Sequence, residues 1–167
     1  MTPSLHSSRA ALRHLRALCA ACLLATALPA AAEAPPAAAS PEQSYERVDL
    51  TSLVDKSRTA MPGQKIILRP TPVSFTATLV RLPEPQRADY LIQVLQMMRV
   101  GEVPEVKERI VLGYGDDRYL TAYIEAATAR RLAATAKAGE RRRFYALHAY
   151  NYSKGPALLV TSFGERE

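Results

Sequence analysis

Hydrophobic and polar residues alternate along two stretches of the chain in the pattern of a half-buried β-strand. Residues 73–79 place Val, Phe, Ala and Leu at every second position, with Ser and Thr between them. In residues 119–124 the same alternation turns Leu120, Ala122 and Ile124 toward one face and Tyr119 and Tyr123 toward the other. Because side chains alternate between the two faces of a strand, both stretches predict strands with one face against a core.

Short apolar runs bounded by turn residues indicate further strands. They cover residues 64–69, 109–114, 144–152 and 157–163. Pro70 is expected to close the first of these runs, and Pro83 is expected to stop the strand that contains 73–79. The sequences GDDR at 115–118 and SKGP at 153–156 are typical of tight turns, so the last four strands form two hairpins.

Two stretches have helical periodicity instead. Apolar residues recur at helical spacing between Pro85, which suits a first helical turn, and Gly101, a candidate C-terminal cap. They are Ala88, Leu91, Ile92, Leu95 and Met98. A strand over 90–97 is the alternative interpretation. The second helix is Ala-rich and covers 126–138, with Gly139 expected to end it. Its inward stripe would be Ala129, Leu132, Ala133 and Ala136.

The order of the elements predicts an α+β fold that is mostly β. A five- or six-stranded antiparallel barrel or curved sheet with two helices accommodates it, and a helix between the third and fourth strands resembles the plan of the OB-fold. The helix at 85–101 would then be an insertion between the first two strands. This resemblance rests on element order across about residues 64–164, without a family motif. An open α+β sheet covered by two helices is the rival arrangement.

The first 32 residues have the three parts of a secretory signal peptide. Arg9, Arg13 and Arg16 form the positive region, residues 18–28 are apolar, and Ala30–Ala32 provide a small-residue cleavage site. The apolar run is short for a transmembrane helix, which needs about 20 residues. We therefore expect cleavage near Ala32 and a periplasmic or secreted product without a stable transmembrane anchor. An uncleaved anchoring helix is the alternative.

Removal of this segment changes the composition on which function is judged. The chain has 167 residues and a formal charge of +6, with 22 basic and 16 acidic side chains. Three of the basic side chains, none of the acidic ones and both cysteines lie in residues 1–32, so the remaining chain carries +3 and no sulfhydryl. Cys19 and Cys22 are thus interpreted as part of the signal rather than as a redox or metal pair.

The expected organisation has three parts. Residues 1–32 are the signal peptide, residues 33–62 are a Pro/Ala-rich tether and irregular lead-in, and residues 63–167 form a single β-rich domain. Within the lead-in, Val48, Leu50, Leu53 and Val54 fit either a short helix or an edge strand, and the sequence does not decide between them.

Side chains with catalytic chemistry are sparse after residue 32. His148 is the single remaining histidine and lies in an apolar strand, where a packed histidine is the simpler interpretation. Asp116 and Asp117 are adjacent on a predicted turn, which turn propensity explains. The phosphate-binding loops and the nucleophile-elbow motif do not occur in the sequence. We therefore assign no catalytic residue, metal ligand or cofactor, and favour a protein without enzymatic activity. The alternative is a hydrolase or other enzyme that uses Asp116, Asp117 and His148 for acid–base chemistry.

Arginine and tyrosine are the remaining candidates for binding. Arg141, Arg142 and Arg143 open a strand, and Arg130 and Arg131 lie on the preceding helix, so the fold would bring the five close together. Tyr119 and Tyr123 would add exposed aromatic surfaces, with Tyr145, Tyr150 and Tyr152 nearby in the sheet. The alternative is a solvated helix face with tyrosines at the rim of the core.

These observations favour a small exported, non-enzymatic binding or accessory module of the cell envelope or extracellular space. Its ligand is not identified by the sequence, and its partner would be an envelope protein or an anionic polymer. The alternative function is polyanion binding, to nucleic acid or an anionic glycan, through the arginine-rich residues 130–143 with Tyr119 and Tyr123.

Overall fold

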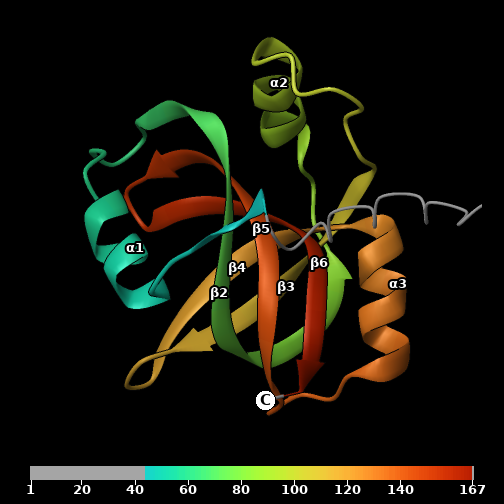
Figure 1. Ribbon diagram of the computed structural model, residues 1–167. Helices are drawn as coiled ribbons and strands as arrows, with labels where there is room; N and C mark the ends of the chain where they lie inside the picture. Colours follow the sequence, from blue (N-terminus) through green and yellow to red (C-terminus); the bar gives the residue numbers. More distant parts are fainter. Residues whose placement is uncertain (1–43, 167) are drawn as a thin grey trace, which may run out of the picture. The chain divides into compact units, whose positions relative to one another are not determined.

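The computed structural model describes residues 44–166, which form an α+β arrangement made mostly of strands (Figure 1). Its elements are β1 (Glu46–Arg47), α1 (Leu50–Ser57), β2 (Lys65–Pro85), α2 (Asp89–Met97), β3 (Val106–Tyr114), β4 (Arg118–Glu125), α3 (Ala126–Thr135), β5 (Arg141–Tyr152) and β6 (Gly155–Arg166). The expected signal peptide, and the tether as far as residue 43, lie outside the described residues. No helix within residues 44–166 is long and apolar enough to cross a bilayer.

Five of the six strands form a closed ring. Each strand bonds to the next in the order β2, β3, β4, β6, β5, and β5 pairs again with β2. The β4–β6 pairing is parallel, whereas the other four pairings of the ring are antiparallel. With α3 between the third and fourth barrel strands and α2 between the first two, this is the predicted OB-like plan. Because β2 and β5 close the ring, the open sheet is excluded.

Two details of the predicted fold class are corrected. The sheet is mixed, since β1 pairs in parallel with β2 in addition to the parallel β4–β6 contact. Three helices are present rather than two, because the stretch 45–62 contains both of the elements between which the sequence did not decide. β1 is an edge strand, and α1 follows it after two residues. The Asp49 side chain caps α1 by accepting the backbone N–H of Ser52 at 2.8 Å.

Strand β2 runs through prolines that were expected to end it. It continues past Pro70 and Pro83 as far as Pro85, whereas separate strands were predicted on either side of Pro70. The pairing register shifts between Ile67 and Thr71, and again between Arg81 and Glu84. Since proline lacks the N–H that a regular ladder uses, Pro70 and Pro83 are accommodated in these irregular segments.

The alternative strand over 90–97 is wrong, and the predicted helix is confirmed as α2. Pro85 ends β2 and does not belong to the first turn of the helix, which begins at Asp89. Its expected glycine cap is also wrong, because Arg99 adopts the left-handed conformation, with φ of 51°. The backbone N–H groups of Arg99 and Val100 donate to the carbonyls of Gln96 and Leu95 and close the last turn. Helix α3 likewise ends at Thr135 rather than at Gly139, and the Thr135 carbonyl accepts a hydrogen bond from the Arg142 side chain.

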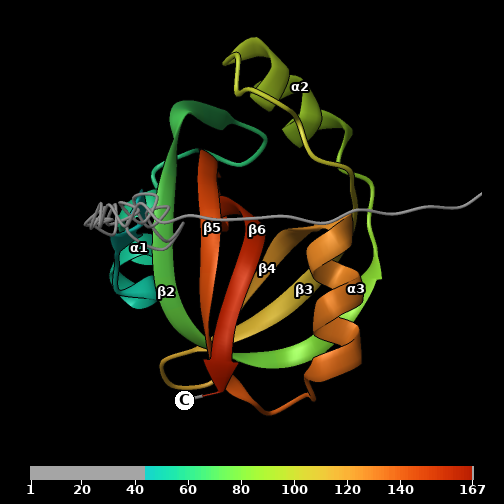
Figure 2. The ribbon, with the colours of Figure 1, turned by 45° about the vertical axis from the view of Figure 1, so that its right-hand side comes forward.

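The hydrophobic residues form two buried clusters. The first fills the barrel and includes Phe75 and Phe144 together with the predicted inward residues Leu120, Ala122 and Ile124. Helix α3 runs alongside the barrel (Figure 2). Its predicted inward residues Ala129, Leu132 and Ala136 are buried there, while Ala133 is exposed.

The second cluster lies where α2 meets strands β5 and β6. Leu91 and Leu95 of α2 are fully buried beside Tyr150, Ala157 and Leu159. An amphipathic helix inserted between two barrel strands has to bury its apolar stripe, and this contact buries it. The insertion therefore packs α2 against the strands of the β5–β6 hairpin.

Candidate functional site: a hollow lined by tyrosines

A hollow of about 350 Å³ lies between the α2 insertion and the barrel. Ten residues line it: Lys65, Gln86, Tyr90, Arg109, Thr121, Tyr123, Tyr150, Tyr152, Lys154 and Ala157. They come from the start of β2, the β2–β3 connection, the middle of β3 and β4, and the β5–β6 hairpin. Residues far apart in the sequence thus meet at one place on the surface because the barrel closes.

Four tyrosines form the aromatic part of this hollow. Tyr150 is 4% exposed and packs edge-on against Tyr90, with ring centroids 5.1 Å apart and planes at 85°. The ring centroid of Tyr152 lies 6.3 Å from that of Tyr150, and the two ring planes form an angle of 54°. Tyr90, Tyr123 and Tyr152 are half-buried and pack against the second hydrophobic cluster. The tyrosine rings are therefore held in place before any ligand arrives.

Tyr150 and Tyr152 of the hollow stay protonated at neutral pH. Burial raises the pKa of Tyr150 well above its ordinary value, and the neighbouring Tyr123, with which it shares a hydrogen bond, raises it further. Burial also raises the pKa of Tyr152, again with a smaller contribution from Tyr123. Each of these two phenols can consequently donate one hydrogen bond and accept another.

The charged side chains that line the hollow are all basic. The Lys65 ammonium lies 3.4 Å from the centroid of the Tyr90 ring. Arg109 donates from Nε to Oε1 of Glu84 at 2.7 Å, so part of its charge is balanced. Lys154 sits in the exposed turn between β5 and β6 and forms no ion pair with any of residues 44–166. The hollow therefore has a positive rim around hydroxyl-rich walls.

The hollow occupies the face that OB-fold barrels use for ligands. In that fold the second and third strands, with the loops that join strands one to two and four to five, form the binding surface. Here these parts are β3, β4, the connection containing α2, and the turn at Lys154. This correspondence holds at the level of fold, and the side chains decide what the face can bind.

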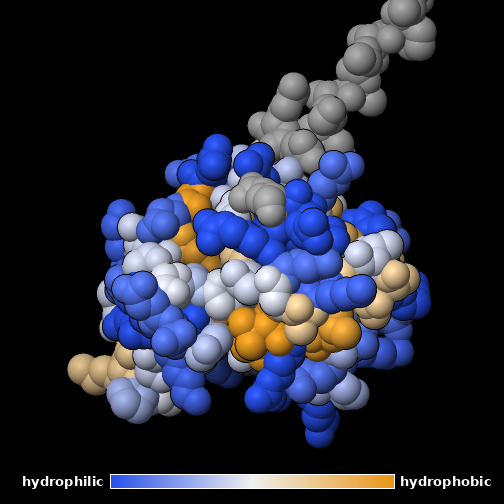
Figure 3. All heavy atoms as spheres, turned by 90° about the horizontal axis from the view of Figure 1, so that it is seen from below, coloured by the Kyte–Doolittle hydropathy of each residue, from blue (hydrophilic) through white to orange (hydrophobic). Residues whose placement is uncertain are grey.

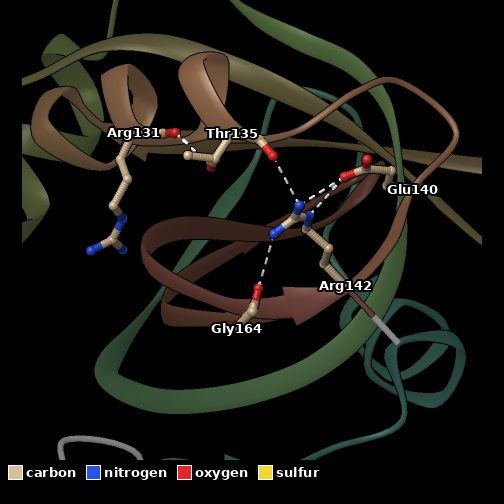
Figure 4. Close-up of polar contacts among 5 residues, drawn as sticks. All are labelled: Arg131, Thr135, Glu140, Arg142 and Gly164. Carbon is tan, nitrogen blue, oxygen red and sulfur yellow. Dashed lines mark hydrogen bonds and ion pairs between the residues drawn. The ribbon is translucent and has the colours of Figure 1, made fainter.

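Arg142, one of the predicted binding residues, is directed into the protein. Its guanidinium donates to Oε2 of Glu140 from Nε at 3.0 Å and from Nη2 at 2.8 Å. It also donates to the carbonyls of Thr135 and Gly164, at 3.1 and 3.3 Å (Figure 4). Arg142 is 9% exposed. It therefore connects the end of α3 with strands β5 and β6.

The other four predicted arginines are spread over different surroundings. Arg131 donates to Ser162 Oγ at 3.1 Å and, like Arg142, lies near the Phe163 ring. Arg130 is exposed on α3. The pKa of Glu105 is lowered chiefly by its hydrogen bond and charge contact with Lys107, and the charge of Arg130 adds a smaller contribution. Arg141 and Arg143 lie opposite Thr78 and Thr76 on β2, with Arg141 exposed and Arg143 half-buried. Hydrophilic residues dominate the end of the barrel where β5 starts and β6 finishes (Figure 3).

Tyr119 and Tyr123 point to the same side of β4 but line different depressions. Tyr123 belongs to the hollow described above, whereas Tyr119 is 59% exposed and lines a groove of about 420 Å³ together with Arg118 and Arg141. Arg118 is paired with Asp55 of α1 at 3.1 Å. Of the predicted binding residues, the structure thus places Tyr119 with Arg141 and Tyr123 with the other tyrosines.

His148 and the pair Asp116 and Asp117, the candidates for acid–base chemistry, lie in a strand and in a turn. His148 is 9% exposed, and its Nε2 lies 2.6 Å from Oδ1 of Asn151. Burial lowers its pKa, while the contact with Asn151 raises it by less. Asp116 and Asp117 lie in the β3–β4 turn, where Asp117 has a φ of 50°. Within residues 44–166, no three His, Cys, Asp or Glu side chains are grouped to hold a metal ion.

Sequence reasoning identified Tyr123, Tyr150 and Tyr152 but not the residues that complete the hollow. Tyr90 lies beside the apolar stripe of α2 and carries no signal in a helical pattern. Lys65, Arg109 and Lys154 are single basic residues that do not belong to a run of positive charge in the sequence. The comparisons add no relative to this description: no protein-family model matches the chain, and no curated protein is significantly similar to it.

Proposed function

We propose that this chain is an exported, non-enzymatic binding module that holds its ligand in the tyrosine-lined hollow. The observation that carries the proposal is the composition of that hollow: four tyrosines and three basic side chains, with no acidic side chain among its lining residues. Ligand sites are concave, with aromatic side chains and converging polar groups that orient the ligand, and the tyrosines and basic side chains of the hollow are of these kinds.

The side chains of the hollow support binding rather than catalysis. Its lining contains no histidine, carboxylate or cysteine, and the raised pKa values of Tyr150 and Tyr152 keep these phenols from acting as bases at neutral pH. The other ionisable side chains of the lining are Lys65, Arg109 and Lys154, and no histidine or carboxylate among the lining residues forms a nucleophile–base pair with them. General acid–base and nucleophilic mechanisms need such pairs.

Affinity capture with a variant of the hollow tests the proposal. The tagged full chain would be expressed, purified and incubated with an envelope extract at native abundance. Replacing Thr121 and Lys154 by Glu puts negative charge on two exposed positions of the hollow and should abolish capture of the partner. The control, Ser52→Glu with Lys56→Glu, makes the same charge change on the exposed side of α1 and should retain it.

Two results would count against the proposal. Equal capture by the hollow variant and its control would show that the ligand binds elsewhere. Recovery of no partner by the unmodified chain would remove the case for a binding module of the envelope.

The groove beside Tyr119 favours a second candidate, polyanion binding through the arginine-rich residues. Arg141 and Tyr119 both line this groove, which combines a positive charge with an exposed aromatic ring. Replacing Arg141 and Arg143 by Ala should weaken binding to all sequences of a polyanion alike. The slope of log affinity against log salt concentration should fall by an amount equivalent to up to about two ion contacts. Unchanged affinity in this double variant would reject the second candidate.

A further inference from the structure

The chemistry of the hollow distinguishes between the classes of anionic ligand, and this inference rests on the proposed function. Three features matter: the hydroxyl groups of its walls, the mutual angles of its tyrosine rings, and the position of its basic side chains. Each can be compared with what a nucleic acid strand or an acidic sugar requires.

The walls are rich in groups that bind hydroxyls. Thr121, Gln86 and the phenols of Tyr90, Tyr123 and Tyr152 all line the hollow. Each hydroxyl both donates and accepts a hydrogen bond, and an amide does the same with separate atoms. A sugar ring has hydroxyls around its edge and C–H groups on its faces, so it matches a surface of phenols on both counts.

The tyrosine rings are poorly placed to stack successive bases. A strand of nucleic acid needs exposed aromatic faces spaced along a groove. Tyr90 and Tyr150 are nearly perpendicular, at 85°, and the Tyr150 ring is almost completely buried. All four rings gather in one hollow of about 350 Å³, which suits one or two compact rings rather than an extended strand.

The basic side chains require a negative group on the ligand. Lys154 projects from the β5–β6 turn without an ion pair among residues 44–166, and the Lys65 ammonium faces the Tyr90 ring. Arg109 is already paired with Glu84. Two lysines at the rim of one hollow can bind a negatively charged group of the ligand, and neutral sugars have no such group.

We propose that the hollow binds a carboxylate-bearing sugar unit of an anionic oligosaccharide. The sugar ring packs against Tyr123 and Tyr152 and exchanges hydrogen bonds with their hydroxyls, while its carboxylate lies toward Lys154 and Lys65. Nucleic acid is an outcome of the test rather than part of the proposal.

Isothermal calorimetry with defined probes tests this assignment. Protein purified from cells that express the full chain would be titrated with a galacturonic acid hexamer, with the same hexamer after reduction of its carboxyl groups, and with a single-stranded oligothymidylate. We expect the acidic hexamer to bind at least about tenfold more tightly than its reduced form, since a charge-assisted contact is worth about one factor of ten or more.

Matched variants locate the binding. Lys154→Gln should lower the affinity for the acidic hexamer by about tenfold, because it removes one charged contact, and should leave the affinity for the reduced hexamer unchanged. Tyr152→Phe removes one hydroxyl and should weaken both hexamers. Lys56→Gln removes the same charge from the exposed surface of α1 and should change neither.

Three outcomes would overturn the inference. The first is equal affinity for the two hexamers, and the second is binding of oligothymidylate while neither hexamer binds. The third is that Arg141→Gln abolishes binding of the acidic hexamer whereas Lys154→Gln does not. If the hollow variant loses its captured partner while the acidic hexamer does not bind, the sugar assignment fails and the proposed function stands.

Discussion

Three consecutive arginines open β5, and their surroundings differ because successive side chains of a strand point to opposite faces. Arg141 is exposed and Arg143 half-buried, whereas Arg142 is buried and donates to one carboxylate and two backbone carbonyls. In the sequence the three form one charge run. The central guanidinium, however, satisfies the last carbonyl of α3 and one near the end of β6, so its main contribution is to the fold.

Arg142→Ala should lower the free energy of unfolding by about 2–3 kcal/mol, because it removes a guanidinium that is only 9% exposed, together with its four hydrogen bonds, two of which go to a carboxylate. Urea unfolding followed by circular dichroism measures the change. Arg141→Ala is the matched control, since it removes an exposed arginine next in the chain and should change stability by less than about 0.5 kcal/mol. Equal effects of the two substitutions would contradict the structural role of Arg142.

His148 gives a second test at the scale of one residue. Its ordinary pKa of 6.5 is lowered in the folded protein, chiefly by burial. Between the lowered value and 6.5 the unfolded chain therefore binds more protons than the folded one, and stability is lost as the pH falls through this window. Three carboxyl groups with lowered pKa values change the stability only at lower pH, below about 4.5, and therefore outside this window. They are Asp49, Glu105 and Glu140.

His148→Gln should flatten the change of unfolding free energy between about pH 7.5 and pH 5, because glutamine has no proton to gain in this range. Urea unfolding at several pH values measures the slope for both proteins. If the variant keeps the slope of the unmodified chain, the histidine does not titrate as its burial implies.

At the scale of elements, the contact between α1 and the β5–β6 turn depends on one glycine. Gly155 has a φ of 128°, and a Cβ atom there would lie 3.2 Å from Cγ1 of the fully buried Val54. Any other residue would be strained in this conformation and would press on α1. The same turn carries Lys154, so it matters for the hollow as well.

Gly155→Ala should destabilise the fold by about 1–3 kcal/mol, the usual cost of a strained backbone conformation. Gly101→Ala is the control: its Cβ would meet nothing within 4 Å and its φ is not in the left-handed region, so it should be neutral or slightly stabilising. Thermal unfolding compares the two. Equal stability of both variants would show that the turn tolerates a side chain.

Elements with a regular period could be predicted from the sequence, and irregular ones could not. The alternation in β4 and the apolar stripe of α2 led to confirmed elements because each reflects contact with a core. The passage of β2 through Pro70 and Pro83 depends on register shifts with its neighbours. The left-handed Arg99 depends on hydrogen bonds that close the last turn of α2. Neither leaves a pattern in the order of residues.

The candidate site was predictable only in part for a related reason. Tyr123, Tyr150 and Tyr152 stood out as aromatic residues in strands, but Lys65 and Tyr90 join them through the pairing of β2 with β5 and the packing of α2. Those contacts join residues far apart in the chain. A charge run such as Arg141–Arg143 is visible in the sequence, whereas a rim built from single lysines is visible only in the fold.

At the scale of the whole molecule, two hydrophobic clusters have to provide the stability of the domain. The chain after residue 32 contains no cysteine, so no disulfide can support it in an oxidising compartment. The barrel closes by hydrogen bonds on every side, which leaves few unpaired strand edges. Such a domain could function outside the cytoplasm without covalent cross-links, which is what the proposed export requires.

Export itself is the last prediction, and it concerns residues outside those that the structure describes. Cells expressing the full chain with a C-terminal tag should export a product whose intact mass begins at Glu33, because the small residues Ala30–Ala32 follow an apolar run of signal-peptide length. Replacing Leu23 and Leu24 by Arg should block this step and leave the uncleaved chain inside the cell, since charge in the apolar run prevents insertion. Replacing the same residues by Ile keeps the run apolar and should preserve both export and the mass. An exported product that retains residues 1–32, or equal export of the Arg variant, would contradict the assignment of this segment as a signal peptide and the envelope function built on it.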